Sequence, residues 1–153
     1  MPGRVEYFDD PSAPRANSLV VAVTAIVTND DGDLILQKRT DNELWGLPGG
    51  AMNIGESIGQ AVIREVFEET ALQVEPTGIV GIYSDPCHII AYADGEVRQE
   101  FSICFTARIV SGQLAVGDTE STEVRFVKAS ELDDLSNGPL HAHSHPTLPR
   151  AKD

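Results

Sequence analysis

The strongest constraint on the fold is one amphipathic segment, residues 57–70, which lies between stretches typical of strands. Ser57 is suited to begin this helix, and Gln60 stands three residues later, as in a weak capping box. The segments predicted to be strands are 19–28, 34–37, 72–74, 79–83, 89–92, 97–110 and 124–127. A hairpin turn is expected at 93–95, and a short helix capped by Ser130 at 130–135. This order predicts a mixed α+β sandwich.

The chain has 153 residues, about the length of one domain. Residues 1–17 are polar and contain three prolines, so we expect an irregular N-terminal arm. The domain is predicted to cover 18–135 and to be followed by an irregular tail at 136–153. His141, His143 and His145 alternate in that tail, as metal ligands on a strand can, but the nearby prolines argue against an ordered strand.

The charge of the chain excludes some partners. Eleven basic and 24 acidic residues give a formal charge of −13, which argues against nucleic acid bound along the surface. Small phosphorylated ligands remain compatible, because bound divalent cations can invert a local field. The sequence has no secretory segment and no apolar run near the roughly 20 residues that a membrane span needs. Two cysteines without a CxxC pair suit a reducing environment, so we expect a cytoplasmic protein with no membrane partner.

The acidic second half of the predicted helix carries the strongest chemical signal. Glu65, Glu68 and Glu69 lie within an arc of roughly 100°, on the side that is apolar in the first half of the helix. Carboxylates grouped on an inward face repel one another, and the negative end of the helix dipole disfavours them further. Divalent cations such as Mg²⁺ would offset both costs. The alternative is a solvated acidic face, with Arg64 and Glu68 as an ordinary ion pair.

The sequence just before the helix favours the metal interpretation. Gly49 and Gly50 precede a short loop that contains a further acid, Glu56. Glycines allow the backbone to approach closely and expose its carbonyl oxygens. The loop can therefore supply one backbone oxygen beside the helix carboxylates.

These residues together resemble the Nudix box. Gly50 is followed after five residues by Glu56, and after seven more by the run Arg64-Glu65-Val66-Phe67-Glu68-Glu69-Thr70-Ala71-Leu72. The resemblance extends over about residues 18–135 and implies an α/β/α sandwich with a mixed β-sheet. One position departs from the pattern, because Ala71 stands where the family usually has glycine. Glycine suits a left-handed cap at the end of a helix, which alanine tolerates poorly.

The resemblance implies an enzyme that hydrolyses a nucleoside diphosphate linked to another group, with Mg²⁺, or alternatively Mn²⁺, as cofactor and water as nucleophile. Glu68 and Glu69 would be the chief metal ligands, and the Gly50 carbonyl would complete the site. Glu65 would be a further ligand or the general base. In this scheme Arg64 would orient a neighbouring glutamate, and Glu56 would support the loop or the outer metal shell.

Some members of the family take the base from a later loop. Glu120 and Glu123 are available for that role here, although each also fits a solvated acid that precedes a strand. The identity of the base therefore stays open at this point.

The residues that would select the substrate are less clearly marked. Trp45 can stack on a base or pack in the core, and Lys38 and Arg39 can bind phosphate or be charges on a strand edge. Arg98 has the same two interpretations. Pro86 resembles a proline found in members acting on ADP-ribose, so ADP-ribose or a nucleotide sugar is slightly favoured.

Two other activities fit the same motif. One is a nucleoside triphosphate pyrophosphatase that cleans the nucleotide pool, and the other is a nucleotide-binding regulatory module without turnover. The intact box acids argue against the module. Homodimers are common in such folds, and the sequence leaves the oligomeric state open.

Overall fold

The computed structural model describes residues 4–40, 43–117 and 121–132. The helices are α1 (Ile58–Thr70) and the short 3₁₀ helix η1 (Ala129–Glu131). The strands are β1 (Val5–Phe8), β2 (Ser18–Leu19), β3 (Ala22–Thr28), β4 (Leu34–Arg39), β5 (Trp45–Gly46), β6 (Gly49–Ala51), β7 (Gln73–Ala91), β8 (Val97–Ser111) and β9 (Ser121–Val127).

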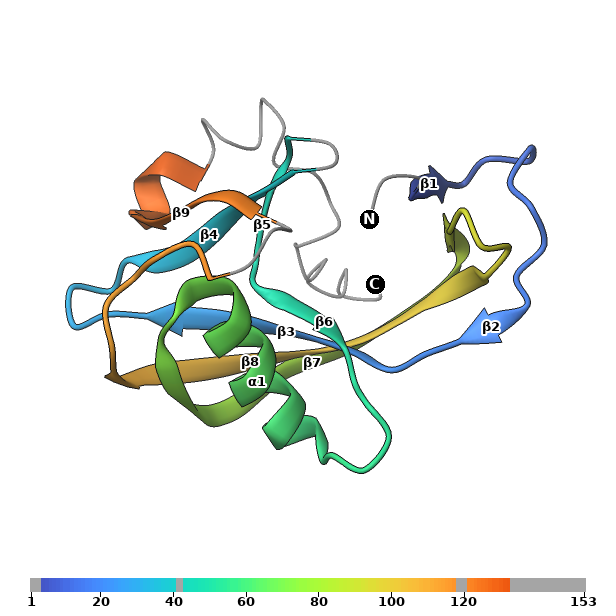
Figure 1. The fold of residues 1–153 in the computed structure, drawn as a ribbon. Helices are drawn as coiled ribbons and strands as arrows, with labels where there is room; N and C mark the ends of the chain where they lie inside the picture. Colours follow the sequence, from blue (N-terminus) through green and yellow to red (C-terminus); the bar gives the residue numbers. More distant parts are fainter. Residues whose placement is uncertain (1–3, 41–42, 118–120, 133–153) are drawn as a thin grey trace, which may run out of the picture.

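The strands form one mixed sheet with the order β1-β7-β8-β3-β4-β5. In addition, β2 pairs with β8, β6 with β3, and β9 with β4. The β3–β8 and β2–β8 pairs are parallel, whereas the other pairs are antiparallel. Helix α1 lies against one face of this sheet (Figure 1). The predicted α+β class with a mixed sheet is therefore confirmed.

Helix α1 begins and ends as its sequence dictates. The Ser57 side chain accepts a hydrogen bond from the Gln60 N–H at 3.2 Å, and the Gln60 side chain accepts one from the Ser57 N–H at 2.8 Å. This confirms the predicted capping box. Ala71 ends the helix in the left-handed conformation, with φ of 64°, and its N–H donates to the Phe67 carbonyl at 2.9 Å. Alanine thus occupies the conformation in which the family usually has glycine.

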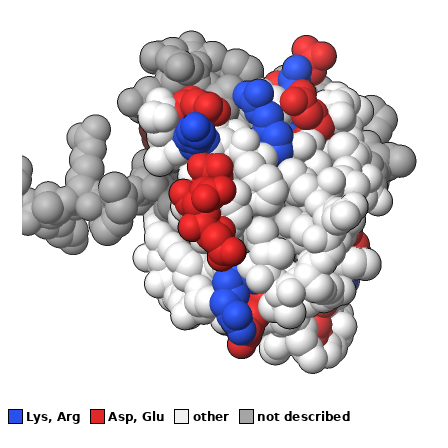
Figure 2. Space-filling view, turned by 90° about the vertical axis from the view of Figure 1, so that its left-hand side faces the viewer, with Lys and Arg blue, Asp and Glu red and all other residues white. Residues whose placement is uncertain are grey.

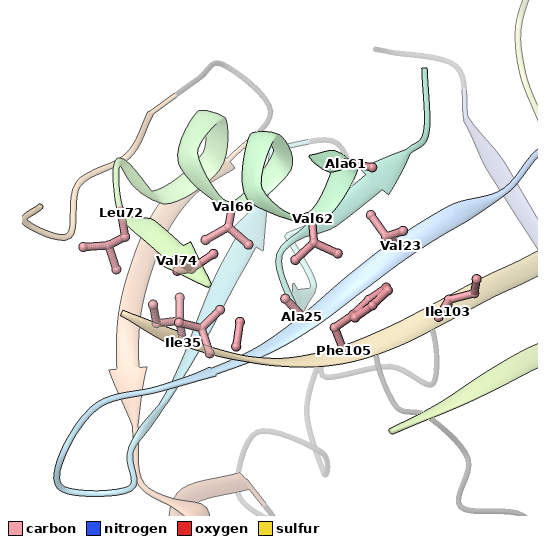
Figure 3. Close-up of a cluster of buried hydrophobic side chains, with 12 residues drawn as sticks. Val23, Ala25, Ile35, Ala61, Val62, Val66, Leu72, Val74, Ile103 and Phe105 are labelled. Carbon is pink, nitrogen blue, oxygen red and sulfur yellow. The ribbon is translucent and has the colours of Figure 1, made fainter. Parts of the chain in front are cut away.

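The core that supports the site lies between α1 and the sheet. Alternate residues of β3 (Val23, Ala25 and Val27) are fully buried, which is the two-residue period of a strand with one covered face. From α1, the small and β-branched side chains of Ala61, Val62 and Val66 meet this face (Figure 3). A second buried cluster contains Leu36, Trp45 and Val127.

Several elements differ from the sequence-based expectations. The N-terminal arm is not irregular throughout, because residues 5–8 form β1 and pair with residues 88–91 of β7. The predicted strands at 72–74, 79–83 and 89–92 belong to one long strand, β7, whose register shifts near Pro76, Gly81 and Asp85. The expected strand 19–28 is divided into β2 and β3. Residues 45–46 and 49–51, which were not among the expected strands, form β5 and β6.

The region after β9 is only partly described. The helix expected from Ser130 is a 3₁₀ turn that begins at Ala129, with Lys128 in the capping position. The rest of that segment, Glu120 and the three tail histidines lie outside the described residues. No helix in the described ranges is long and apolar enough to cross a membrane.

Candidate active site

The glycine pair of β6 makes direct contact with the acidic half of α1. The N–H of Gly49 donates a hydrogen bond to Oε2 of Glu69 at 2.9 Å. A Cβ atom added at Gly50 would lie 2.6 Å from the Cδ atom of Glu65. This close approach depends on glycine at position 50, because a side chain there would displace the carboxylate. This contact places the predicted backbone ligand next to a predicted carboxylate ligand.

Arg64 connects the loop to the helix. Its Nε and Nη2 atoms donate to both carboxylate oxygens of Glu56, at 3.0 and 2.7 Å, and Nη2 also donates to the Ala51 carbonyl at 3.0 Å. Its Nη1 atom donates to Glu65 at 2.7 Å and to Glu68 at 3.2 Å. One guanidinium thus joins three glutamates, and a two-oxygen contact of this kind fixes geometry as well as charge.

This contact has a clear effect on ionisation. Hydrogen bonds from Arg64, and then from the Asn53 N–H, lower the pKa of Glu56 to about 2. The same contact with Glu56 raises the pKa of Arg64. Both groups therefore stay charged at neutral pH and clamp the loop to the helix.

The three helix carboxylates are not equivalent. Glu69 is buried, with 2% of its surface exposed, whereas the Glu68 side chain is 50% exposed and that of Glu65 is 13% exposed. Within the described ranges, no group of three or more His, Cys, Asp or Glu side chains is close enough to hold a metal ion. The predicted inward acidic face is therefore divided, with Glu69 and Glu65 against β6 and Glu68 at the surface.

The donor chemistry of this site still suits a hard divalent cation. Glu65 and Glu69 offer carboxylate oxygens beside the backbone of β6, and oxygen is the ligand that Mg²⁺ prefers. The closeness of the Glu65 carboxylate to Gly50 brings two predicted ligands together without any intervening side chain. The residues present therefore fit a magnesium site, both in the oxygen ligands that they offer and in their closeness to one another.

A cleft lined by arginines lies beside these carboxylates. It consists of two overlapping cavities that share the β6 residues 49–51 with Arg4, Arg39, Tyr92 and Arg98. Glu65 lines one cavity and Glu100 lines the other, so three arginines face one glutamate in each. In a chain of formal charge −13, a cleft with a net positive lining is suited to a small anion.

Two of these arginines, Arg39 and Arg98, were expected to bind substrate. Arg98 contacts both oxygens of Glu96 and donates to the Tyr92 hydroxyl at 3.1 Å, and its guanidinium lies 4.5 Å from the centre of the Tyr92 ring. Arg4 was not expected, because the proline-rich arm gave no indication that its first described residues join the sheet. The only local signal was the short β-prone run at residues 5–8.

The structure places three other predicted site residues away from the cleft lining. Trp45 is 7% exposed and packs with Leu36 and Val127, and the Arg125 guanidinium lies 4.6 Å from its ring centre. Lys38 pairs in β4 with Glu123 of β9. Glu123 is thus an exposed strand residue, not a loop residue as expected. Trp45 fits the packing alternative, and neither Lys38 nor Glu123 contributes to the cleft.

The face shown in Figure 2 carries few charged side chains, and they are of both signs. On this face, acidic and basic side chains lie next to one another in a vertical band and in a second group near the upper edge, and most of the surface between them is uncharged. This face offers no broad basic area of the kind that a nucleic acid backbone requires.

Comparison with known protein families matches residues 18–150 to the NUDIX domain. The chain belongs to the Nudix family. A MutT-like protein of Streptomyces ambofaciens is 40% identical over 91% of this chain and 92% of its own length. An ADP-ribose pyrophosphatase of Methanocaldococcus jannaschii is 35% identical over 82% of this chain and 68% of its own length.

Solved structures agree with this assignment. A MutT protein from Methanosarcina mazei superposes with a TM-score of 0.64 and 26% identity, covering 86% of this chain and 89% of its own. A MutT Nudix hydrolase from Burkholderia pseudomallei gives the same TM-score and identity, over 82% and 92% of the two chains. The chain is thus a Nudix pyrophosphohydrolase, a type of enzyme that acts on phosphoric anhydride bonds and generally uses divalent metals such as Mg²⁺.

Proposed function

We propose that this chain hydrolyses the diphosphate of a nucleoside diphosphate linked to a second group, with ADP-ribose or a nucleotide sugar as substrate and Mg²⁺ as cofactor. One observation carries the proposal: Glu65 and three arginines line the same cavity beside Gly49 and Gly50. A diphosphate in this cavity would lie beside both a carboxylate and three guanidinium groups. Binding there requires a cation beside the carboxylate, because phosphate and carboxylate repel each other.

Glu65, Glu69 and the Gly50 carbonyl would hold the metal, and Glu68, predicted as a further ligand, would have to turn toward them from the surface. When bound, Mg²⁺ would neutralise the diphosphate and lower the pKa of a water molecule. The chain's own contribution is positioning. Arg64 orients Glu65 through the 2.7 Å contact, and the Gly49 N–H orients Glu69. Of the predicted bases, Glu65 is better placed than Glu123 to accept a proton from the attacking water, because Glu65 lines the cavity and Glu123 does not.

The choice of substrate rests on similarity and on the cleft. The relative from M. jannaschii is named an ADP-ribose pyrophosphatase, and so is a structure from Streptococcus suis with a TM-score of 0.59 and 25% identity. A second candidate, hydrolysis of nucleoside triphosphates, is supported by a putative 8-oxo-dGTP diphosphatase of Bacillus subtilis, 32% identical over 70% of this chain.

A product-resolved screen of nucleotides, with and without Mg²⁺, tests the proposal. Hydrolysis of ADP-ribose to AMP and ribose 5-phosphate only when Mg²⁺ is present supports it. Release of pyrophosphate from nucleoside triphosphates as the main reaction would favour the second candidate. Tight nucleotide binding without cleavage of any member of the panel would instead indicate a regulatory module and would contradict both activities.

A further inference from the structure

We propose that Arg4 is a substrate-binding residue that donates to a phosphate oxygen of the substrate, so that the N-terminal segment forms part of the active site. The identity of the ligand rests on the proposed function. Three observations support the contact: the position of Arg4 in the cleft, its unused hydrogen-bonding capacity, and the packing that anchors the adjacent strand β1.

The sheet brings Arg4 into the cleft from a distant part of the sequence. It immediately precedes β1, whose Val5 pairs with Ala91 of β7. The hairpin that follows β7 carries Tyr92 and Arg98, and both line the same two cavities as Arg4. Glu65 and the glycines of β6 also line one of these cavities. Arg4 therefore faces the same space as the residues proposed to hold the diphosphate.

The guanidinium of Arg4 has donors that the described part of the protein does not use. It forms an ion pair with Glu6 through Nη2. Its Nε atom is buried and has no hydrogen-bond partner among the described residues. A buried donor without an acceptor is unfavourable. A phosphate oxygen that enters beside the partly exposed guanidinium would satisfy Nε after a small shift of the side chain, and guanidinium groups bind phosphate strongly. Arg98 differs in this respect, because Glu96 and Tyr92 already engage its three nitrogen atoms.

A packed network anchors β1, the strand that follows Arg4. Glu6 accepts from Arg4 with one carboxylate oxygen, and its other oxygen lies 3.0 Å from Nε2 of His88. His88 is 8% exposed and stacks against Phe8, with ring centres 4.3 Å apart. Its Nδ1 atom lies 3.7 Å from the Glu100 carboxylate, which belongs to the cleft lining. This arrangement anchors β1 beside the cleft and so places Arg4, the residue that precedes it, within reach of a ligand.

A purely structural alternative is that Arg4 only attaches β1 through Glu6. The chain offers a matched control for this alternative in Arg108, which also pairs with one glutamate, Glu75, across two strands. Arg108 does not line the cleft. Lysine at either position keeps the positive charge but loses the planar fork that binds phosphate.

The test measures binding without turnover. The probe is ADP-ribose with a methylene group in place of the bridging oxygen of the diphosphate, titrated calorimetrically in the presence of Mg²⁺. We expect Arg4→Lys to weaken binding about tenfold or more, since charged hydrogen bonds to phosphate are the strong ones. Arg108→Lys should bind within about twofold of the wild type on the same scale. Binding by Arg4→Lys within twofold of the wild type would overturn the inference.

A second variant separates ligand binding from attachment of β1. Glu6→Gln removes the charge of the ion pair but leaves the donors of Arg4 and an amide oxygen to accept from them. We expect it to lower the Tm as much as Arg4→Lys does, while binding stays within about threefold of the wild type. If Glu6→Gln and Arg4→Lys weaken binding equally, Arg4 acts only by holding β1 and the inference is wrong.

Hydrolysis by the wild type is measured separately, so the two proposals can fail independently. Absence of hydrolysis across the nucleotide panel refutes the proposed function. Weaker binding of the probe by Arg4→Lys, but not by Arg108→Lys, would still support the phosphate contact. Conversely, Mg²⁺-dependent hydrolysis together with unchanged binding by Arg4→Lys refutes the Arg4 inference alone. In an active enzyme, the substitution should raise KM while kcat stays within about twofold, which is the signature of a uniform binding contact.

Discussion

Substitution of Gly50 by alanine should inactivate the enzyme without unfolding it. The added Cβ would lie 2.6 Å from Cδ and from Oε1 of Glu65, and 2.7 Å from Oε2. Ordinary contact begins near 3.4 Å, so the carboxylate must retreat by about 0.8 Å. The movement also disturbs the 2.7 Å contact between Glu65 and Arg64. The carboxylate is the end of a flexible side chain, so the fold can absorb the displacement.

The expected magnitudes follow from this displacement. A misplacement of about 1 Å at a reacting group can cost roughly 10²-fold in rate, or about 2.7 kcal/mol of transition-state stabilisation. The expected loss of stability is about 1 kcal/mol, at the low end of overpacking, because no backbone has to move. The substitution should therefore reduce kcat/KM far more than it reduces the free energy of unfolding.

The neighbouring glycine provides the control. A Cβ at Gly49 would lie 2.1 Å from the Val23 carbonyl oxygen and 2.9 Å from the Cα atom of Thr24, both of which belong to the backbone of β3. Relief requires β6 to move away from β3, so Gly49→Ala should cost about 3 kcal/mol or more. Thermal and urea unfolding, measured beside Mg²⁺-dependent hydrolysis, give both quantities for each variant.

Substitutions at these two adjacent positions should therefore have opposite effects on activity and stability. Gly50→Ala should keep most of its stability and lose about 10²-fold in kcat/KM, whereas Gly49→Ala should first lose stability. Wild-type activity in a folded Gly50→Ala protein would refute the view that the position of Glu65 matters for catalysis. Unfolding of Gly50→Ala to the same degree as Gly49→Ala would refute the claim that its clash is confined to a side chain.

Three further predictions concern stability and binding. Ala71→Gly should raise stability by about 0.5–1 kcal/mol, a Tm increase of a few degrees, because glycine adopts a φ of 64° without steric cost. Above pH 4.5, urea unfolding in metal-free buffer should show that the wild type is more stable than Glu56→Gln. The pKa of Glu56 in the folded protein is lowered to about 2, so this difference in stability should disappear as the pH falls toward 2. A pH-independent gap between the two would contradict the assigned cause. Trp45→Phe should cost about 1–3 kcal/mol of stability and leave KM unchanged, because Trp45 packs outside the cleft. A raised KM with unchanged stability would instead show that Trp45 binds the substrate.

Helix α1 and the contacts along it were predictable because their determinants are local. The Ser57–Gln60 capping box, the contact of Arg64 with Glu68 and the left-handed cap at Ala71 depend on residues at most four positions apart. The approach of Gly50 to the helix also followed from the motif. The unequal burial of Glu68 and Glu69 did not, because it depends on how β6 lies against the helix.

The parts that the sequence did not predict depend on distant pairings. Strand β1 forms only because residues 88–91 offer a partner about 80 positions away. The interruptions expected in β7 came from its prolines and glycines, which the sheet accommodates as register shifts between paired strands. Arg4 was missed for the same reason as β1. Trp45 had two interpretations, and only the positions of Leu36 and Val127 distinguish between them.

The central claim is that the carboxylates of α1, positioned by β6, support Mg²⁺-dependent cleavage of a diphosphate. Turnover of ADP-ribose by Glu69→Gln, with folding verified by thermal unfolding, tests it most directly. Glu69 is buried and accepts from the Gly49 N–H, and glutamine keeps the shape and one acceptor oxygen while it removes the charge. We predict near-complete loss of Mg²⁺-dependent hydrolysis in a folded protein. Wild-type turnover by that variant would contradict the account.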